Sequence, residues 1–260
     1  MELENTSAAA WSADFEQLSD LIVETEDIKA FLDGMACLAA KVVSRSAGTR
    51  VECGVTLGRH KRPGTIGGST DKAMELERME QTLGEGPCID ALVNGRPVLL
   101  DDAHASPQWP DYRGALSAAG MHSALGVPLA LAEDGAAVLT FFSTAPGSFT
   151  RDVVAEALTF SELASKALRV ALRITSLNEL AEHLDAAIKS RSVIDTACGV
   201  IISQNRCTQD EAFAILRKAS SDRNQKLHDL AAALVDGVGH QQTIPARGGA
   251  SHPKRPVTRT

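Results

Sequence analysis

The sequence predicts an α+β domain that is followed by a long helix and by a small module of three helices. Within residues 50–57, apolar and polar side chains alternate, which is typical of a half-buried strand, and further short strand patterns follow between helical ones. Between Val153 and Ile188, apolar side chains recur every seven residues, as in a coiled coil. Between Arg191 and Val238, three short helical patterns follow one another closely.

The first part of the chain contains the elements of the α+β domain. A helical pattern runs from about residue 14 to 43, and the strand at 50–57 leads through a basic turn at 58–64 to a short partner strand at 65–69. The remaining elements are expected as helices at 71–83, 88–93 and 111–119 and as strands at 96–100, 123–131 and 136–143, the last two joined by a turn at 133–135. Strands that pair, are separated by helices and pair again favour an antiparallel sheet with flanking helices.

Several short motifs in this part resemble those of GAF domains of the actinobacterial type. They are Leu83-Gly-Glu-Gly-Pro-Cys88-x-Asp90-Ala-Leu92, Gly95-x-Pro97-Val98, Trp109-Pro110, Gly120-x-x-Ser123-x-Leu125-x-Val127-Pro128-Leu129 and Phe149-Thr150. The resemblance implies a sensory domain over residues 14–152, which responds to a signal or to an unknown small-molecule ligand held between sheet and loops. GAF domains share a fold but not a ligand, so the residues of a ligand pocket stay unassigned.

The heptad pattern at residues 153–190 predicts a linker helix. Its core positions are occupied by Val153, Phe160, Ala167, Ile174, Ala181 and Ile188 and, between them, by Leu163, Val170, Leu177 and Leu184. Because such a seam buries its apolar side chains against a second helix, the pattern indicates a coiled coil that joins two copies of the chain as a homodimer. The alternative is a helix that lies on the sheet, and it applies above all to the first half.

Local signals mark the helices of the C-terminal module. Thr208 and Glu211 form a capping box at the start of the second helix. Asn224 is expected to cap the third helix, whose end is predicted at Gly237 and Gly239. The residues expected to face inward are Ile194, Ala197, Val200, Ile201, Ala212, Leu216, Ala219, Leu227, Leu230, Ala231, Leu234 and Val238.

Residues 177–238 resemble an ANTAR domain, the RNA-binding output module of bacterial transcription antiterminators. The resemblance is carried by Ile194-Asp195-x-Ala197-x-Gly199-Val200-Ile201, by Asp210-Glu211-Ala212-Phe213-x-x-Leu216-Arg217-x-Ala219-Ser220 and by Asn224-x-Lys226-Leu227-x-Asp229-x-Ala231. It implies that two modules of a dimer bind paired hairpin loops in a leader RNA and prevent the terminator from forming. One position departs from the pattern: many members have Lys where this chain has Cys198, so an RNA contact made by that Lys would be missing here.

RNA loops present unstacked bases and phosphates, so their binders need cationic groups together with amide or hydroxyl donors. The candidate RNA-binding residues are Arg191, Arg206, Arg217, Lys218, Ser221, Arg223, Asn224 and Lys226. Arg217, Asn224 and Lys226 belong to the ANTAR-like blocks, and Arg191 and Arg206 are expected to border the same patch. The alternative for these charges is a solvated helix face, and for Asn224 a helix cap. The module has no Tyr or Trp, so base stacking is expected to rest on Arg or His228.

The charge distribution agrees with an RNA-binding C-terminal part. The chain has a net charge of −7, which argues against uniform binding to nucleic acid or membrane. Between Lys189 and Lys226, however, basic residues outnumber acidic ones, and residues 239–260 are predicted to form a disordered basic tail. Neither a signal peptide nor a membrane-spanning run of about 20 apolar residues is recognised, so a cytoplasmic protein without a membrane partner is expected.

Two other functions compete with RNA-binding antitermination. A DNA-binding transcription regulator would present a helix to the major groove, but the connector at residues 220–225 lacks the Gly that a helix-turn-helix often has. A GAF-type reductase would depend on Cys88, whose position at the start of a short helix could lower its pKa. The five Cys residues show no metal-binding spacing and are expected as reduced thiols, and lone His104 and His122 are expected to be surface residues. No catalytic residue, metal site or cofactor is predicted.

Overall fold

The protein is described by a computed structural model that covers all residues except 1, 26, 60–61, 132–134 and 242–260. It divides into two compact units, residues 1–178 and 179–260. The first unit contains the α+β domain, and the second contains the small helical module. Among the described residues, no helix is long and apolar enough to cross a membrane.

The first unit is built on a five-stranded antiparallel sheet with the strand order β2-β1-β5-β4-β3. The strands are β1 (Val51–Arg59), β2 (Arg62–Gly68), β3 (Val98–Leu100), β4 (Ser123–Leu129) and β5 (Ala136–Ser143). Residues of β1 and β5 alternate between the two faces, and both faces are buried because helices cover each of them. The predicted antiparallel sheet with flanking helices is therefore confirmed.

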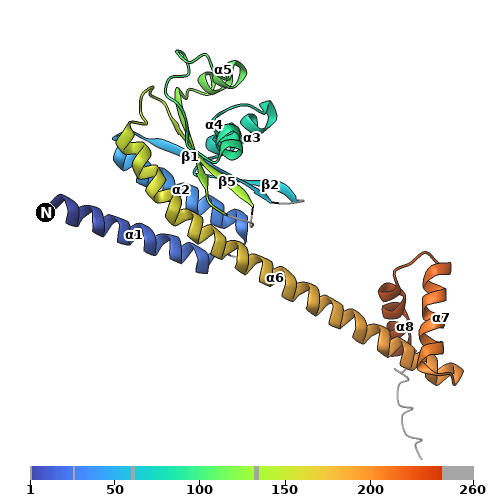
Figure 1. The fold of residues 1–260 in the computed structure, drawn as a ribbon. Coiled ribbons are helices and arrows are strands. Elements are labelled where there is room, and N and C mark those ends of the chain that lie inside the picture. The colour runs from blue at the N-terminus through green and yellow to red at the C-terminus, as the bar shows by residue number, and fades with distance from the viewer. Residues whose placement is uncertain (1, 26, 60–61, 132–134, 242–260) are drawn as a thin grey trace, which may run out of the picture. The chain divides into compact units, whose positions relative to one another are not determined.

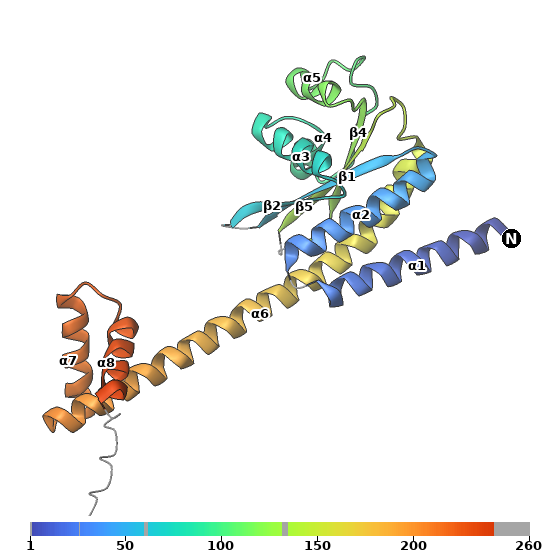
Figure 2. The same ribbon diagram turned by 180° about the vertical axis from the view of Figure 1, so that it is seen from behind.

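One face of the sheet is covered by α2 (Ile28–Ala47) and the first half of α6 (Arg151–Asn205), and α1 (Glu2–Glu24) lies on the outer side of these helices, as Figures 1 and 2 show. The largest hydrophobic core lies between these helices and the sheet. Fully buried aromatic side chains come from all three layers of this core: Phe31 from α2, Phe141 from β5 and Phe160 from α6. The opposite face carries α3 (Asp71–Leu83), α4 (Pro87–Asn94) and α5 (Pro110–Ala118) over smaller clusters.

Two of these short helices receive their N-terminal caps from glutamates elsewhere in the chain. The N-cap residue of α4 is Gly86, which has no side chain, and Oε1 of Glu80 instead accepts hydrogen bonds from the backbone N–H groups of Cys88 and Ile89. In α5, Oε1 of Glu85 accepts from the N–H groups of Asp111 and Tyr112, both at 3.1 Å. Each carboxyl thus satisfies two of the donors that a helix start leaves free.

Several element boundaries differ from the prediction. The single helix expected at residues 14–43 is two helices, because Asp27 begins α2 as its N-cap and accepts from the N–H of Ala30 at 2.8 Å. Much of the basic turn expected at residues 58–64 belongs to β1 and β2, which extend to Arg59 and start at Arg62. The turn expected at residues 133–135 lies largely outside the described residues.

The linker helix and the first helix of the C-terminal module form one continuous helix, α6, of 55 residues. The core of the first unit includes side chains from the first half of α6: Val153, Ala157, Phe160, Ala164 and Leu168. This half of the helix therefore lies on the sheet, which was the predicted alternative to a coiled coil. Further along, the heptad residues become exposed. The exposed apolar residues of α6 beyond residue 169 are Val170, Ile174, Leu177, Leu180, Leu184 and Ile188, with exposed fractions between 41% and 68%.

The second unit consists of the end of α6, α7 (Gln209–Asp222) and α8 (Leu227–Gln241). The prediction that Gly237 and Gly239 end the third helix is wrong, since α8 continues to Gln241. Residues 239–241 are therefore helical, whereas the rest of the predicted disordered tail lies outside the described residues.

Candidate functional site

The C-terminal module has a small core to which each of its three helices contributes small or branched side chains. The buried members are Ala197, Cys198, Ile201, Ala212, Leu216 and Ala231. Small residues at the contact points allow the helices to approach closely. Cys198, which replaces a Lys common in ANTAR domains, is 2% exposed and belongs to this core. Burial raises the pKa of its thiol, and Asp195 and Cys207 raise it further, so Cys198 has a packing role and offers no cation to RNA.

The corner between α6 and α7 is fixed by local hydrogen bonds. Arg206 adopts a left-handed conformation (φ 53°) and its N–H donates to the carbonyl of Ile202 at 2.8 Å, which ends α6. The predicted capping box then starts α7. The Thr208 hydroxyl accepts from the N–H of Glu211, and the Glu211 carboxylate accepts from the N–H of Thr208 at 2.9 Å. The prediction for this helix start is confirmed.

The corner between α7 and α8 is a Schellman motif with Asn224 at its left-handed position (φ 50°). The N–H of Gln225 donates to the carbonyl of Ser220, and the N–H of Asn224 donates to that of Ser221, both at 3.1 Å. Asn224 therefore ends α7, and the prediction that it caps the following helix is wrong, because α8 starts only at Leu227. Asn is suited to this position because it adopts the left-handed conformation more readily than other residues with a Cβ.

The eight predicted RNA-binding residues are all exposed. Arg217, Lys218 and Ser221 lie on α7, and Arg223, Asn224 and Lys226 follow in the α7–α8 connection, so the structure brings these six together at one end of the module. Among the described residues, none of the four cations in this set has an ion-pair partner. Unpaired cations at the surface can exchange their counterions for the phosphates of a nucleic acid.

The other two predicted residues do not border this corner. Arg206 lies before α7 and Arg223 after it, and a helix of 14 residues separates them by about 20 Å. Arg191 lies on α6 and is within 3.9 Å of Asp195, one turn further along. In Figures 1 and 2, the α7–α8 connection lies at the end of α7 that faces away from α6.

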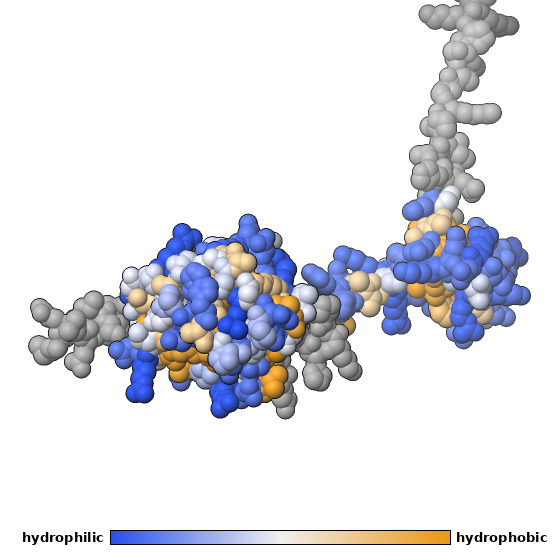
Figure 3. Space-filling view, turned by 90° about the horizontal axis from the view of Figure 1, so that it is seen from above, coloured by the Kyte–Doolittle hydropathy of each residue, from blue (hydrophilic) through white to orange (hydrophobic). Residues whose placement is uncertain are grey.

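The structure adds an aromatic side chain to the interface. Phe213 is 41% exposed, and because it precedes Arg217 and Ser221 by four and eight residues, the three share one face of α7. Base stacking is predicted for Arg or His228, and Phe213 is an additional candidate that the sequence did not indicate. Phe213 directly follows Ala212, which faces inward, so its own side chain points away from the middle of the core. Figure 3 shows the module with a mainly hydrophilic surface in which some hydrophobic side chains are exposed.

In the first unit, the face that carries α3 and α4 contains a buried polar cluster. The Thr56 hydroxyl donates to Glu77, and Glu80 caps α4. One oxygen of each carboxyl and the Tyr112 hydroxyl are buried without a hydrogen-bond partner. The packing is close, since a side chain at Gly54 would overlap Glu77. The protein's own side chains thus fill the space beside Gly54.

Cys88 is part of this cluster and is fully buried at the start of α4. Burial raises the pKa of its thiol far above the ordinary value, and the carboxyls of Glu77 and Glu80 raise it further. The prediction that the helix start lowers this pKa is therefore wrong, because burial and two neighbouring acids outweigh the helix dipole. A Cys-dependent reductase acts through a thiolate, and this environment opposes its formation.

The other Cys and His residues that the structure describes form no metal-binding group. All five Cys side chains are free of disulfides in the structure. The rings of His104 and His122 lie 4.9 Å apart, and His122 is only partly exposed. Within the described part of the chain, no three or more His, Cys, Asp or Glu side chains are placed to hold a metal ion.

Comparisons with known proteins identify two families along the chain. A family model described as GAF domain matches residues 12–169, and one described as ANTAR domain matches residues 182–235. Among curated proteins, none matches the chain.

Solved structures resemble the first unit at low sequence identity. An N-acylhomoserine lactone dependent LuxR family transcription factor, CepR2 from Burkholderia cenocepacia, is 18% identical and covers 62% of this chain and 94% of its own, with a TM-score of 0.46. A free methionine-R-sulfoxide reductase from Neisseria meningitidis is 16% identical and covers 65% of this chain and 93% of its own, with a TM-score of 0.44. The GAF domain of an Acinetobacter phosphoenolpyruvate-protein phosphotransferase is 15% identical and covers 63% of this chain and 96% of its own, with a TM-score of 0.43. Similarities at this level imply neither a ligand nor an activity here.

Proposed function

The chain belongs to the GAF domain family and carries an ANTAR domain at residues 182–235, and from this we propose that it is a dimeric transcription antiterminator. The two domains imply a sensory part and an RNA-binding regulatory part. In the proposed mechanism, two ANTAR modules of a homodimer bind paired hairpin loops of a leader RNA and keep the terminator from forming. Such a protein would act in the cytoplasm, where transcripts are made.

The observation that carries this proposal is a group of cations where α7 meets the α7–α8 connection, which we call the cationic corner. Four exposed cations, Arg217, Lys218, Arg223 and Lys226, have no ion-pair partner within the described part of the chain, although the chain as a whole is negatively charged. Phosphate contacts provide affinity, whereas an exposed aromatic ring such as that of Phe213 provides a surface on which an unstacked base can lie. The combination suits a hairpin loop better than a duplex, because only the loop presents its bases.

Exposed apolar residues on α6 support the dimer. Ile174, Leu177, Leu184 and Ile188 occupy heptad core positions and are 41% to 68% exposed in the single chain. Fully burying such a side chain contributes about 1.5–3 kcal/mol. Because these residues are only a little over half exposed on average, eight of them from two chains would contribute on the order of 7–14 kcal/mol. Association costs roughly 4–15 kcal/mol, so this seam supports a dimer whose stability depends on protein concentration.

The continuity of α6 suggests how a signal reaches the RNA-binding module. Residues between Val153 and Leu172 pack in the core of the sensory unit, and residues between Ala197 and Ile201 pack in the core of the module. No Pro or Gly interrupts the helix between these two segments. A small rotation or register change of the paired helices would therefore reposition both modules of the dimer.

The DNA-binding alternative is less favoured by the composition of the last helix. In a helix-turn-helix protein, the second helix of the pair lies in the major groove and reads base edges. Here that helix would be α8, which contains no Lys or Arg and exposes Asp229 and Asp236. Arg and Lys make the commonest specific contacts in the major groove, so α8 is poorly equipped for this role.

A gel-shift titration tests the proposed function. The ligands are a paired-hairpin leader RNA, the same RNA with scrambled loops, and duplex DNA, each at two salt concentrations because phosphate contacts make affinity salt-dependent. Arg217→Glu and Lys226→Glu change the cationic corner, and Lys166→Glu on the exposed side of α6 provides a control with the same change of charge.

Preferential binding to the intact loops, weakened at least tenfold by Arg217→Glu and by Lys226→Glu but not by Lys166→Glu, would support the proposal. Equal affinity for all three ligands would contradict recognition of loops. Stronger binding to the duplex DNA would favour the DNA-binding alternative.

A further inference from the structure

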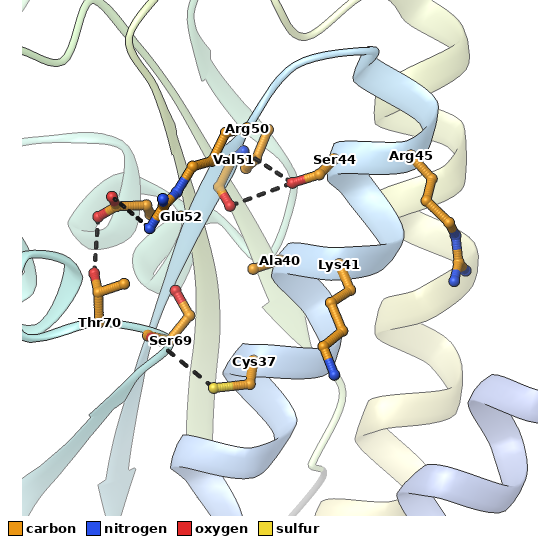
Figure 4. A pocket seen from close by; sticks show the side chains of 10 residues that line it. All are labelled: Cys37, Ala40, Lys41, Ser44, Arg45, Arg50, Val51, Glu52, Ser69 and Thr70. Carbon is orange, nitrogen blue, oxygen red and sulfur yellow. Dashed lines mark hydrogen bonds and ion pairs between the residues drawn. The ribbon is translucent and has the colours of Figure 1, made fainter.

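The first unit contains an open pocket of about 590 Å³ on the side of the sheet that carries α2. Figure 4 shows it between the last turns of α2, the start of β1 and the connection from β2 to α3. It is lined by Cys37, Ala40, Lys41, Ser44, Arg45, Arg50, Val51, Glu52, Ser69 and Thr70. Its volume lies within the range of pockets that hold small molecules, roughly 300–1,000 Å³. The pocket lies apart from the polar cluster around Glu77.

The pocket exists because β2 stops short of the beginning of β1. The ladder between these strands starts at Gly54 opposite Gly68, so the first residues of β1 pair only with β5. The chain turns away after Gly68 toward α3, and the space beside Val51 and Glu52 is left without a strand. The side chains of α2 form the wall above this space, as Figure 4 shows.

Two serines close the exposed edge of β1. The N–H of Val51 donates to the Ser44 hydroxyl at 2.9 Å, and the N–H of Cys53 donates to the Ser69 hydroxyl at 2.9 Å. The Ser44 hydroxyl in turn donates to the carbonyl of Val51, and the N–H of Ser69 donates to that of Cys53. The edge therefore has no backbone groups to offer to an added peptide strand, and a ligand of this pocket must be recognised by side chains.

The charged side chains of the lining favour an anion. Arg45 is engaged with the buried carboxylate of Asp14 at 2.6 Å, and Arg50 is only within 3.9 Å of Glu52. Among the described residues, Lys41 has no ion-pair partner. The lining thus holds the weakly paired Arg50 and, among the described residues, the unpaired Lys41, although the net charge of the chain is −7. Beside them, Ala40 and the side chain of Cys37 offer a less polar surface.

We propose that this pocket binds a small organic phosphate, with the phosphate held by Lys41 and Arg50 and the organic part lying against Ala40 and Cys37. A phosphate attracts both cations, and it accepts hydrogen bonds from ammonium and guanidinium groups. This inference deepens the sensory part of the proposed function and relies on that function only for its regulatory meaning, since binding itself requires no RNA.

Alkylation of Cys37 tests the proposal with the full chain. Cys37 is exposed and lines the pocket, whereas the other partly accessible thiol, Cys207, lies in the C-terminal module. The rates at which N-ethylmaleimide modifies the two thiols are measured by peptide mass spectrometry. The probes are adenosine 5′-monophosphate, ribose 5-phosphate, inorganic phosphate, and adenosine and ribose as uncharged counterparts. A bound phosphate ester is expected to slow modification of Cys37 and leave that of Cys207 unchanged.

Three variants and one control locate the site. Lys41→Glu and Arg50→Glu are each expected to weaken binding of the effective phosphate ester at least tenfold in calorimetric titration, because each removes a charged hydrogen-bond donor. Ala40→Leu reduces the room for the organic part without changing charge, and it is expected to weaken binding of the ester but not of inorganic phosphate. Arg78→Glu, on the exposed side of α3, makes the same charge change away from the pocket and is expected to have no effect.

The proposal is overturned if neither phosphate ester protects Cys37, or if Arg78→Glu weakens binding as much as Lys41→Glu. It is also overturned if inorganic phosphate protects as well as the esters and 0.3 M sodium chloride abolishes the effect, which would indicate unspecific attraction of anions. Because no RNA is present, these results are independent of the gel-shift outcome. Protection of Cys37 in a protein that binds no RNA would retain the pocket and contradict the antiterminator.

Discussion

Replacing Glu80 should separate its role as a helix cap from its role as a buried acid. Its carboxyl is fully buried and accepts the N–H groups of Cys88 and Ile89 at the start of α4. Glu80→Gln retains an oxygen in the same place and can keep both hydrogen bonds. Glu80→Met has a similar length but no acceptor, so it leaves the buried N–H of Cys88 and the partly buried N–H of Ile89 without partners.

The expected loss follows from the number of donors that become unsatisfied. Each buried donor without a partner costs about 1–3 kcal/mol, so the loss of two partners in Glu80→Met should lower the free energy of unfolding by roughly 2–6 kcal/mol. Removal of ordinary N-cap side chains costs about 0.5–2 kcal/mol, and the buried position places Glu80 above that range. At about 2–4 °C per kcal/mol for a domain of this size, Tm should fall by roughly 4–24 °C. At neutral pH, Glu80→Gln should retain or raise the free energy of unfolding, because the amide avoids the cost of protonating a carboxyl that is ionised in the unfolded chain.

The pH dependence has a definite sign. Burial raises the pKa of Glu80 well above its ordinary value, and the neighbouring Glu77 raises it further, while the N–H groups of Ile89 and Cys88 oppose this. The folded protein therefore prefers the protonated acid. The resulting stabilisation is fully present below the pKa of the unfolded chain, near 4.3, and it is lost as pH rises through the higher pKa of the folded protein. The free energy of unfolding should therefore fall as pH rises above about 4.3, and less so in Glu80→Gln.

Urea unfolding followed by tryptophan fluorescence measures these differences. Both Trp residues of the chain, Trp11 and Trp109, precede α6, so the signal reports on the sensory unit. Wild type and both variants are compared at several pH values between 5 and 8. A free energy of unfolding that rises with pH in the wild type, or equal losses in Glu80→Gln and Glu80→Met at pH 7, would refute the reasoning.

Three further predictions concern the helical part. Leu177→Asp combined with Leu184→Asp should place charges in the α6 seam and convert a dimer to a monomer in analytical ultracentrifugation, whereas unchanged mass would remove the coiled coil from the proposal. Phe213→Ala should weaken loop RNA binding by about 1–3 kcal/mol in gel shifts and leave duplex DNA binding unchanged. Asn224→Gly should preserve thermal stability and Asn224→Val should reduce Tm, because a β-branched residue resists φ near +50°; equal melting temperatures would argue against the Schellman corner.

Signals that act within a few residues were readable from the sequence. The capping box of Thr208 and Glu211 spans one turn, and the alternation along β1 extends over neighbouring residues, so both could be predicted. The N-cap at Asp27 was equally local, but the continuous apolar pattern on either side of it concealed the break between α1 and α2. Periodicity alone did not show where one helix ends and another begins.

The features that were missed depend on contacts between distant segments. Glu80 and Glu85 cap helices that begin several residues later or after a further helix, and nothing in their own neighbourhood indicates this. The raised pKa of the Cys88 thiol results from burial beside two acids on another helix, Glu77 and Glu80. The pocket beside Val51 depends on where β2 stops, which the alternating pattern of β1 does not reveal.

The contribution of α6 to the first core affects the order in which the protein can fold during synthesis. All five strands have been made once Ser143 has left the ribosome, but the α2 face of the sheet still lacks one of its layers. That layer is completed only when the segment through Leu172 emerges. The nascent sensory domain therefore exposes an apolar sheet face for some thirty residues of further translation, and a fragment ending at residue 152 should be prone to aggregation.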